Sequence, residues 1–102
     1  MAEFNRYRVY IYSAHQYDWD VRVDLYSGGA PCATLLFMKA GRAPPPNSSN
    51  NGIALLHFPM SHYPAVIDLL RNEQPLFVTI NADNGIGVVS TGDEPVGEEE
   101  GR

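Results

Sequence analysis

Three histidines and one cysteine are the side chains in this chain whose chemistry suits acid–base catalysis, nucleophilic attack or metal binding. His57 and His62 are five residues apart, a spacing that common metal sites do not use. His15 lies close to Asp18, and a site that joined these two residues to His62 would need a loop to meet the start of a predicted helix. Because no nucleophile–base motif accompanies the histidines, we predict no catalytic residue, no metal site and no enzyme activity.

Cys32 follows Pro31 at the start of a predicted strand, with no second cysteine to form a CxxC motif. A free cysteine is most often a small, half-buried apolar residue, and we interpret Cys32 in this way. The glycines match neither the dinucleotide fingerprint nor the P-loop pattern, so we predict no cofactor. A single unpaired cysteine also fits a reducing cytosol.

Arginines and tyrosines alternate along two predicted strands, "RYRVYIYS" at 6–13 and "WDVRVDLY" at 19–26. Such residues on one sheet face can stack bases and hold phosphates, but they are also typical of a solvated face or a protein interface. Asp20 and Asp24 belong to the same polar set and partly cancel the positive charge. The candidate binding face consists of Arg6, Arg8, Tyr10, Tyr12, Arg22 and Tyr26.

The remaining segments predict the elements that must position this face. The link at 14–18 is short, and "SGGAP" at 27–31 predicts a hairpin turn because paired glycines allow positive φ angles. The segments 32–41 and 52–59 are apolar on both faces, which predicts covered strands. The proline-rich stretch 42–51 predicts a solvated connection between neighbouring strands, with a binding loop as the alternative.

One stretch, "FPMSHYPAVIDLLRNEQP" at 58–75, has the pattern of a helix. We predict Ser61 as its N-cap, Pro64 in its first turn and Pro75 beyond its end. Arg71 lies off the apolar stripe and should face water. The stripe itself consists of Tyr63, Val66, Ile67 and Leu70, and it predicts a helix that covers one face of a sheet.

The segment 76–91 predicts a hairpin with Asn84 and Gly85 as a two-residue turn, which would place Ile80 opposite Val89 and Val78 opposite Thr91. The element order is then β-β-β-β-α-β-β, without the βαβ repeats of a parallel fold. We therefore predict an α+β fold with a twisted, mainly antiparallel sheet or partly open barrel of about six strands and one packed helix.

The net charge of −5 is concentrated at the C-terminus. Residues 93–102 carry five acidic side chains and one arginine, whereas the other 92 residues carry seven acidic and six basic side chains. We predict one domain at 1–92 and a largely disordered acidic tail at 93–102. A nearly neutral body lacks the basic surface that usually accompanies nucleic-acid binding. With no apolar run of 18 residues and no secretory signal, we expect a cytoplasmic protein without membrane contact.

Three segments resemble a group of short, uncharacterised bacterial proteins of unknown function. They are "NRYRVYI" at 5–11, "VIDLLRNEQPLFVTIN" at 66–81 and "STGDEPVGEEE" at 90–100. The resemblance implies a small stand-alone cytoplasmic domain and transfers no site residues. If its "EPVGE" ending is a fixed feature, residues 93–98 would dock on the body instead of remaining disordered.

These patterns favour a non-enzymatic binding or protein-interaction module. Leu36 and Met38 should form an apolar patch on the sheet face that one helix leaves uncovered, so we predict a homodimer. The alternative is a single-stranded nucleic-acid-binding domain that uses the Arg/Tyr face. A small-molecule pocket or minor enzyme built on His62 and Tyr63 ranks last.

Overall fold

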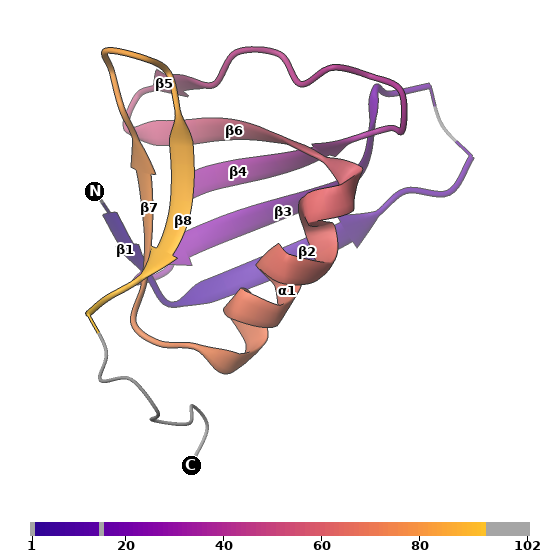
Figure 1. Ribbon diagram of the computed structural model, residues 1–102. Helices are drawn as coiled ribbons and strands as arrows, with labels where there is room; N and C mark the ends of the chain where they lie inside the picture. Colours follow the sequence, from indigo (N-terminus) through magenta and orange to yellow (C-terminus); the bar gives the residue numbers. More distant parts are fainter. Residues whose placement is uncertain (1, 15, 94–102) are drawn as a thin grey trace.

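The structure, a computed structural model, describes residues 2–14 and 16–93, and it confirms an α+β fold. The described chain contains two sheets and one α-helix (Figure 1). The elements are β1 Ala2–Phe4, β2 Arg6–Ile11, β3 Trp19–Ser27, β4 Ala30–Met38, β5 Ser48–Asn50, β6 Ile53–Pro59, the 3₁₀ turn η1 Met60–His62, α1 Tyr63–Asn72, β7 Leu76–Ile80 and β8 Gly87–Thr91. The predicted single sheet of about six strands is therefore wrong in detail.

The predicted strand at 6–13 corresponds to β2, and the structure adds an unpredicted short strand, β1, which precedes Asn5 and belongs to the other sheet. β1 pairs with β7 in a three-stranded sheet of order β1-β7-β8, whereas β2 is the edge of a five-stranded sheet of order β2-β3-β4-β6-β5. The backbone N–H of Asn5 donates to the carbonyl of Tyr26 at 2.9 Å, which holds the chain against β3 where it changes sheets.

The five-stranded sheet is mixed, because β4 and β6 run parallel and Leu35 lies beside Leu56. The connection at 39–47 leads first to β5, and a tight turn then brings β6 back antiparallel to β5. Neighbouring parallel strands need such a crossover, here supplied by the proline-rich loop and β5. The prediction that 42–51 only connects neighbouring strands missed β5.

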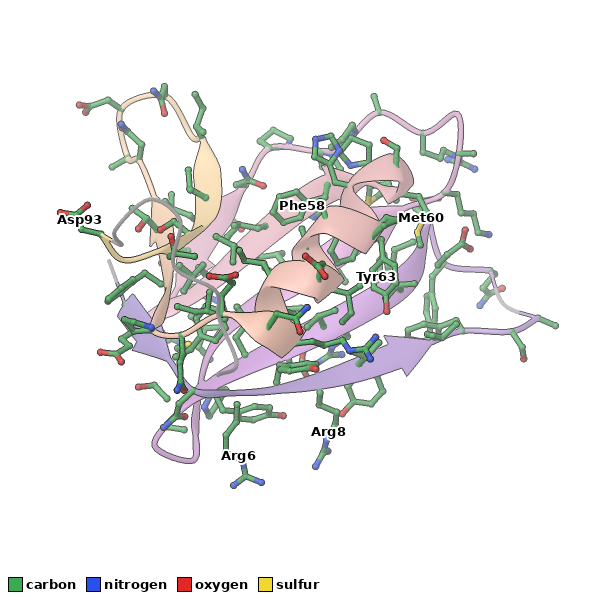
Figure 2. The ribbon with its side chains drawn as sticks, turned by 60° about the horizontal axis from the view of Figure 1, so that its bottom comes forward. Arg6, Arg8, Phe58, Met60, Tyr63 and Asp93 are labelled. Atoms are coloured by element: carbon green, nitrogen blue, oxygen red, sulfur yellow. The ribbon has the colours of Figure 1, made fainter. Side chains whose placement is uncertain are left out.

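The hydrophobic core lies between one face of the five-stranded sheet and the elements that cover it, α1 and the β7–β8 hairpin (Figure 1). Phe37 on β4 is fully buried, and its ring centroid lies 5.3 Å from that of Phe58 and 5.2 Å from that of Tyr63. Figure 2 shows Phe58, Met60 and Tyr63 where the chain passes from β6 into α1. The largest fully buried side chains are Phe37, Leu25, Leu35, Leu56 and Val23.

The predicted helical stripe is confirmed. Leu70 is buried, and Tyr63, Val66 and Ile67 pack against the core, whereas Arg71 is exposed. The predicted cap is wrong, because Ser61 lies inside η1 and no side chain caps either helix start. The N–H of Tyr63 donates instead to the carbonyl of Met60, so the 3₁₀ turn leads directly into α1.

The chain has two Asn–Gly pairs, and the two-residue turn forms at the pair that we did not choose. Asn51 and Gly52 have φ angles of 53° and 79°, and they join Asn50 directly to its partner Ile53. The predicted turn at 84–85 is wrong, because β7 and β8 are joined by residues 81–86. The observed register places Val78 opposite Val89, two residues from the predicted pairing, so each residue keeps its face.

The second face of the five-stranded sheet has no exposed apolar patch at Leu36 and Met38. Their exposed fractions are 7% and 3% within the single chain, although neither belongs to the main core cluster. The reason that we gave for a homodimer is therefore not met, and the dimer itself stays a prediction. In the part of the chain that the structure describes, every helix is too short or too polar to cross a bilayer.

Candidate interaction face

The β2–β3 ladder brings the predicted arginines and tyrosines together. Arg6 lies opposite Tyr26, and Tyr10 lies opposite Arg22, so alternate residues of both strands share one face. This face points away from the side that α1 and the β7–β8 hairpin cover, and Figure 2 shows Arg6 and Arg8 projecting from β2 away from the body. We call it the Arg–Tyr face, formed by Arg6, Arg8, Tyr10, Tyr12, Arg22 and Tyr26.

Arg22 and Asp24 form the fixed part of the face. The guanidinium of Arg22 donates two hydrogen bonds to the Asp24 carboxylate, at 2.8 and 3.1 Å. The hydroxyl of Thr34 donates a third, at 3.2 Å, and Asp24 is buried. The hydrogen bond to Asp24 raises the pKa of Arg22. Arg22 thus forms its ion pair with Asp24 on its own strand. Arg8 lies opposite Asp24 on β2 but forms no ion pair with it in the described structure.

Arg6 and Arg8 are the exposed charges of the face. Arg8 donates a hydrogen bond to the hydroxyl of Tyr10 at 3.3 Å, and this bond raises the pKa of Arg8. Among the residues in 2–14 and 16–93, no carboxylate lies within ion-pair distance of either arginine. Two cations at the sheet edge therefore keep their charge available for a ligand.

An aromatic cluster continues the Arg–Tyr face at the far end of the same strands. The ring of Tyr17 stacks on that of Trp19 at a centroid distance of 4.9 Å, and Tyr12 meets Tyr17 edge-on at 5.4 Å. Tyr17 is 45% exposed, and the buried Nε1–H of Trp19 has no hydrogen-bond partner among the described residues. Nearby, the Arg22 guanidinium lies 5.5 Å from the centroid of the Tyr10 ring. Charged and aromatic side chains thus form one continuous surface.

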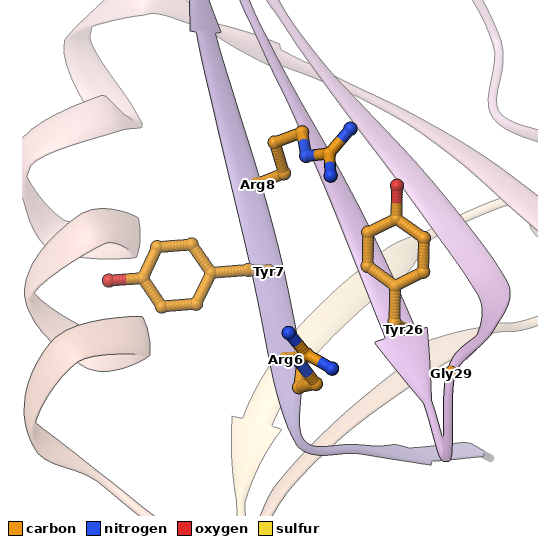
Figure 3. A pocket seen from close by; sticks show the side chains of 5 residues that line it. All are labelled: Arg6, Tyr7, Arg8, Tyr26 and Gly29. Atoms are coloured by element: carbon orange, nitrogen blue, oxygen red, sulfur yellow. The ribbon is translucent and has the colours of Figure 1, made fainter.

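A shallow hollow of about 220 Å³ lies at the edge of this face, around Arg6, Arg8 and Tyr26 (Figure 3). Sequence reasoning missed two of its lining residues, Tyr7 and Gly29. Gly29 sits in the predicted β3–β4 turn, where its φ of 91° and its missing side chain leave space. Tyr7 projects to the opposite side of β2 from Arg8, as Figure 3 shows. Because β2 is an edge strand, the side of the strand that carries Tyr7 is also accessible. The sequence pattern does not show this, because it does not give the position of a strand in the sheet.

The histidines do not gather into a site. His57 lies on β6 and its Nδ1 is buried without a hydrogen-bond partner, while His62 is exposed. Burial lowers the pKa of His57, and the nearby Pro46 backbone partly opposes this shift. Asp18 pairs with Arg42 at 3.1 Å. His15 lies outside the described residues, and within those residues no three metal-ligating side chains come together.

Cys32 is half-buried on β4 and is a free thiol. Burial raises its pKa, which keeps the sulfur protonated and less nucleophilic at neutral pH. The environment therefore matches the small apolar role that the sequence indicates.

Comparisons of the chain with protein families, with curated proteins and with solved structures find no match. The resemblance to short bacterial proteins therefore stays a prediction. The function must be inferred from the surface of this chain alone.

Proposed function

We propose that the protein is a non-enzymatic interaction module that binds another protein through the Arg–Tyr face and the aromatic cluster beside it. The observation that supports this most is the continuous surface from the Arg6 end of β2 to Tyr17, on the sheet side that α1 leaves uncovered. Tyrosine, tryptophan and arginine are the residues most enriched at the energetic centres of protein interfaces. The Arg22–Asp24 pair adds a preformed polar group to that surface.

The geometry favours a protein partner over single-stranded nucleic acid. A base stacks on an open ring face, but Trp19 is already covered by Tyr17, and the Arg22 guanidinium lies near the ring of Tyr10. The face also contains the Asp24 carboxylate, which would oppose phosphate groups. Nucleic-acid binding remains the second candidate because Arg6 and Arg8 are exposed, have no carboxylate partner among the described residues and lie close to exposed tyrosine rings.

Site-specific photo-crosslinking tests the first proposal. A benzoylphenylalanine in place of Tyr17 should cross-link a discrete protein in a lysate of the source cells, and the same group in place of the exposed Asp68 on α1 serves as the matched control. The cross-link at position 17 should disappear when Tyr10→Ala or Arg8→Glu is added. Identical patterns from both positions, or a cross-link that ignores these substitutions, would argue against the interaction face.

Fluorescence anisotropy with a labelled single-stranded oligonucleotide tests the second candidate. If the face binds nucleic acid, affinity should fall steeply between 50 and 200 mM salt, because each neutralised phosphate contributes to the salt dependence. Arg6→Glu with Arg8→Glu should abolish binding, whereas Arg71→Glu should not. Undetectable binding at low salt removes this candidate.

A second copy of the chain is one partner that the module would accept, and we retain the homodimer as part of the proposal. Sedimentation equilibrium on the wild type and on Tyr17→Asp tests whether the dimer exists and uses this face.

A cytoplasmic location also belongs to the proposal, because the free thiol of Cys32 suits a reducing compartment. Fractionation of source cells checks it.

A further inference from the structure

The chain carries its own source of negative charge for the two unpaired arginines. Residues 94–102, which lie outside the described structure, contain four glutamates and one arginine. We propose that this segment docks along the exposed edge of β2, with the carboxylates of Glu98–Glu100 against Arg6 and Arg8. The docking does not depend on the proposed function. Its consequence, competition between the segment and a partner for the Arg–Tyr face, does depend on it.

The sheet pairing brings the start of this segment close to β2. Thr91 pairs with Leu76, and Leu76 pairs with Phe4, which precedes Arg6 by two residues. Paired Cα atoms across antiparallel strands are about 5 Å apart and two strand residues span about 7 Å, so Arg6 lies within about 17 Å of Thr91. Seven extended residues, from Thr91 to Glu98, span about 23 Å. The acidic cluster therefore reaches Arg6, and each further residue extends it along β2.

The direction of the chain also suits this path. β7 is antiparallel to both β1 and β8, so β8 runs in the same direction as β1. β8 consequently ends beside the point where β1 passes into β2, as Figure 1 shows. A chain that leaves Thr91 can continue toward β2 without reversing its direction, and it would pass the end of β7, where Gly92 lies beside Phe77 and Pro75.

The edge of β2 offers what an extended acidic segment requires. β2 pairs with β3 on one side only, so part of its backbone N–H and C=O groups point outward. Arg6 and Arg8 stand on this edge without a carboxylate partner in the described structure, and the hollow beside Tyr26 gives room for side chains. Because the segment is tethered, its effective concentration is in the millimolar range, which favours it over the tail of a second copy.

Nuclear magnetic resonance of the full chain tests the docking directly. Replacing Glu98, Glu99 and Glu100 by Gln should shift the backbone amide signals of Arg6–Arg8 and Gly29 and the Nε–H signals of Arg6 and Arg8. The Nε–H signal of Arg71, an exposed arginine on α1, is the internal control and should stay in place. Raising NaCl from 50 to 500 mM should move the wild-type signals toward those of the variant, because exposed ion pairs are screened.

Substitutions that reverse the charge of the arginines complete the test. Arg6→Glu with Arg8→Glu should remove the effect of the glutamine substitutions, whereas Arg71→Glu should leave it unchanged. The inference is overturned if the glutamine substitutions move no signal of β2 or move signals of α1 instead. It is also overturned if the shifts depend on protein concentration, because the segment would then dock on a second copy. The crosslinking experiment tests the proposed function separately. If the segment also competes with the partner, the wild type should give a several-fold lower yield of the Tyr17 cross-link than the variant with Gln at positions 98–100.

Discussion

The two faces of the five-stranded sheet are built from the same strands but behave differently. On the inner face, Val23, Leu35 and Leu56 are completely buried. On the outer face, Arg22 lies between Tyr10 and Leu36, and the charged and aromatic groups reach solvent. The alternation of side chains along a strand makes this division possible. A sheet of this kind can change its outer surface without losing the core, so the following predictions compare the two faces.

Phe37→Ala should have the largest effect on stability, a loss of about 3–5 kcal/mol. The Phe37 ring is fully buried and stacks near Phe58 and Tyr63, so truncation leaves a cavity. Tyr10→Ala on the outer face is the control and should cost less than about 1 kcal/mol. Urea denaturation measures both. Equal losses would mean that the outer face is part of the stabilising core.

Leu70→Ala should cost about 2–4 kcal/mol, because it removes the most buried residue of α1. Its neighbour Arg71 faces solvent, and Arg71→Ala should change the free energy of unfolding by less than about 0.5 kcal/mol. Chemical denaturation of the two variants decides this. Similar costs would contradict the position of α1 on the inner face.

Gly87→Ala should cost about 1–3 kcal/mol through overpacking. A Cβ atom at Gly87 would stand 2.5 Å from Cγ of Leu56, which is closer than non-bonded carbon atoms approach. Gly28→Ala is a useful control because a Cβ atom there meets no neighbour, although its φ of 60° adds some strain. A thermal unfolding midpoint that falls no further for Gly87→Ala than for Gly28→Ala would argue against the contact between β8 and β6.

Asp24→Asn tests the buried carboxylate of the outer face and should cost about 1–2 kcal/mol. The substitution keeps the shape but weakens the two hydrogen bonds from Arg22. Double-mutant analysis with Arg22→Ala measures the coupling by denaturation. Additive losses would show that the pair does not stabilise the face.

The smallest expected effect concerns pH. Burial lowers the pKa of His57 in the folded protein, so the folded state prefers the neutral imidazole. At a pH above the pKa that His57 has in the unfolded chain, this residue does not change the free energy of unfolding. As the pH falls from that pKa to the lower pKa of the folded state, protonation of the unfolded chain reduces stability. Between pH 7 and pH 5, the wild type should lose more stability than His57→Gln, as measured by urea denaturation at each pH. Parallel pH profiles would contradict this.

Periodicity predicted which side chains share a face, because strand alternation and the helical repeat depend only on local sequence. The candidate face was predicted for the same reason, and the β2–β3 register brings its residues together. The short strand β1 was not predicted, because three residues show little periodicity and their pairing with β7 depends on a distant segment. The hollow was missed for a related reason, because Gly29 enters it from the neighbouring turn.

The two Asn–Gly pairs show where local signals fail. Asn51 and Gly52 follow the preference for a two-residue turn, but Asn84 and Gly85 belong to a wider loop. In that loop the carbonyl of Gly85 accepts a hydrogen bond from the side chain of Asn47 at 2.9 Å. Close packing of Gly87 over Leu56 adds a second tertiary contact. Contacts with Asn47 and with Leu56 on β6 thus accompany a β7–β8 register that the turn residues alone do not predict.

The proline-rich crossover has a consequence for how copies of this chain can stack. Asn47, just before β5, accepts a hydrogen bond from the N–H of His57 at 2.7 Å, so the end of the proline-rich loop lies along the edge of β6. Pro44, Pro45 and Pro46 just before it have no N–H to offer an incoming strand. Growth of a fibril by strand pairing needs two unpaired edge strands on every copy. In the five-stranded sheet, as far as the structure describes it, one edge is β2 with six residues and the other is β5 with three. Strand exchange through this sheet would therefore end at a closed pair and would not grow into a filament.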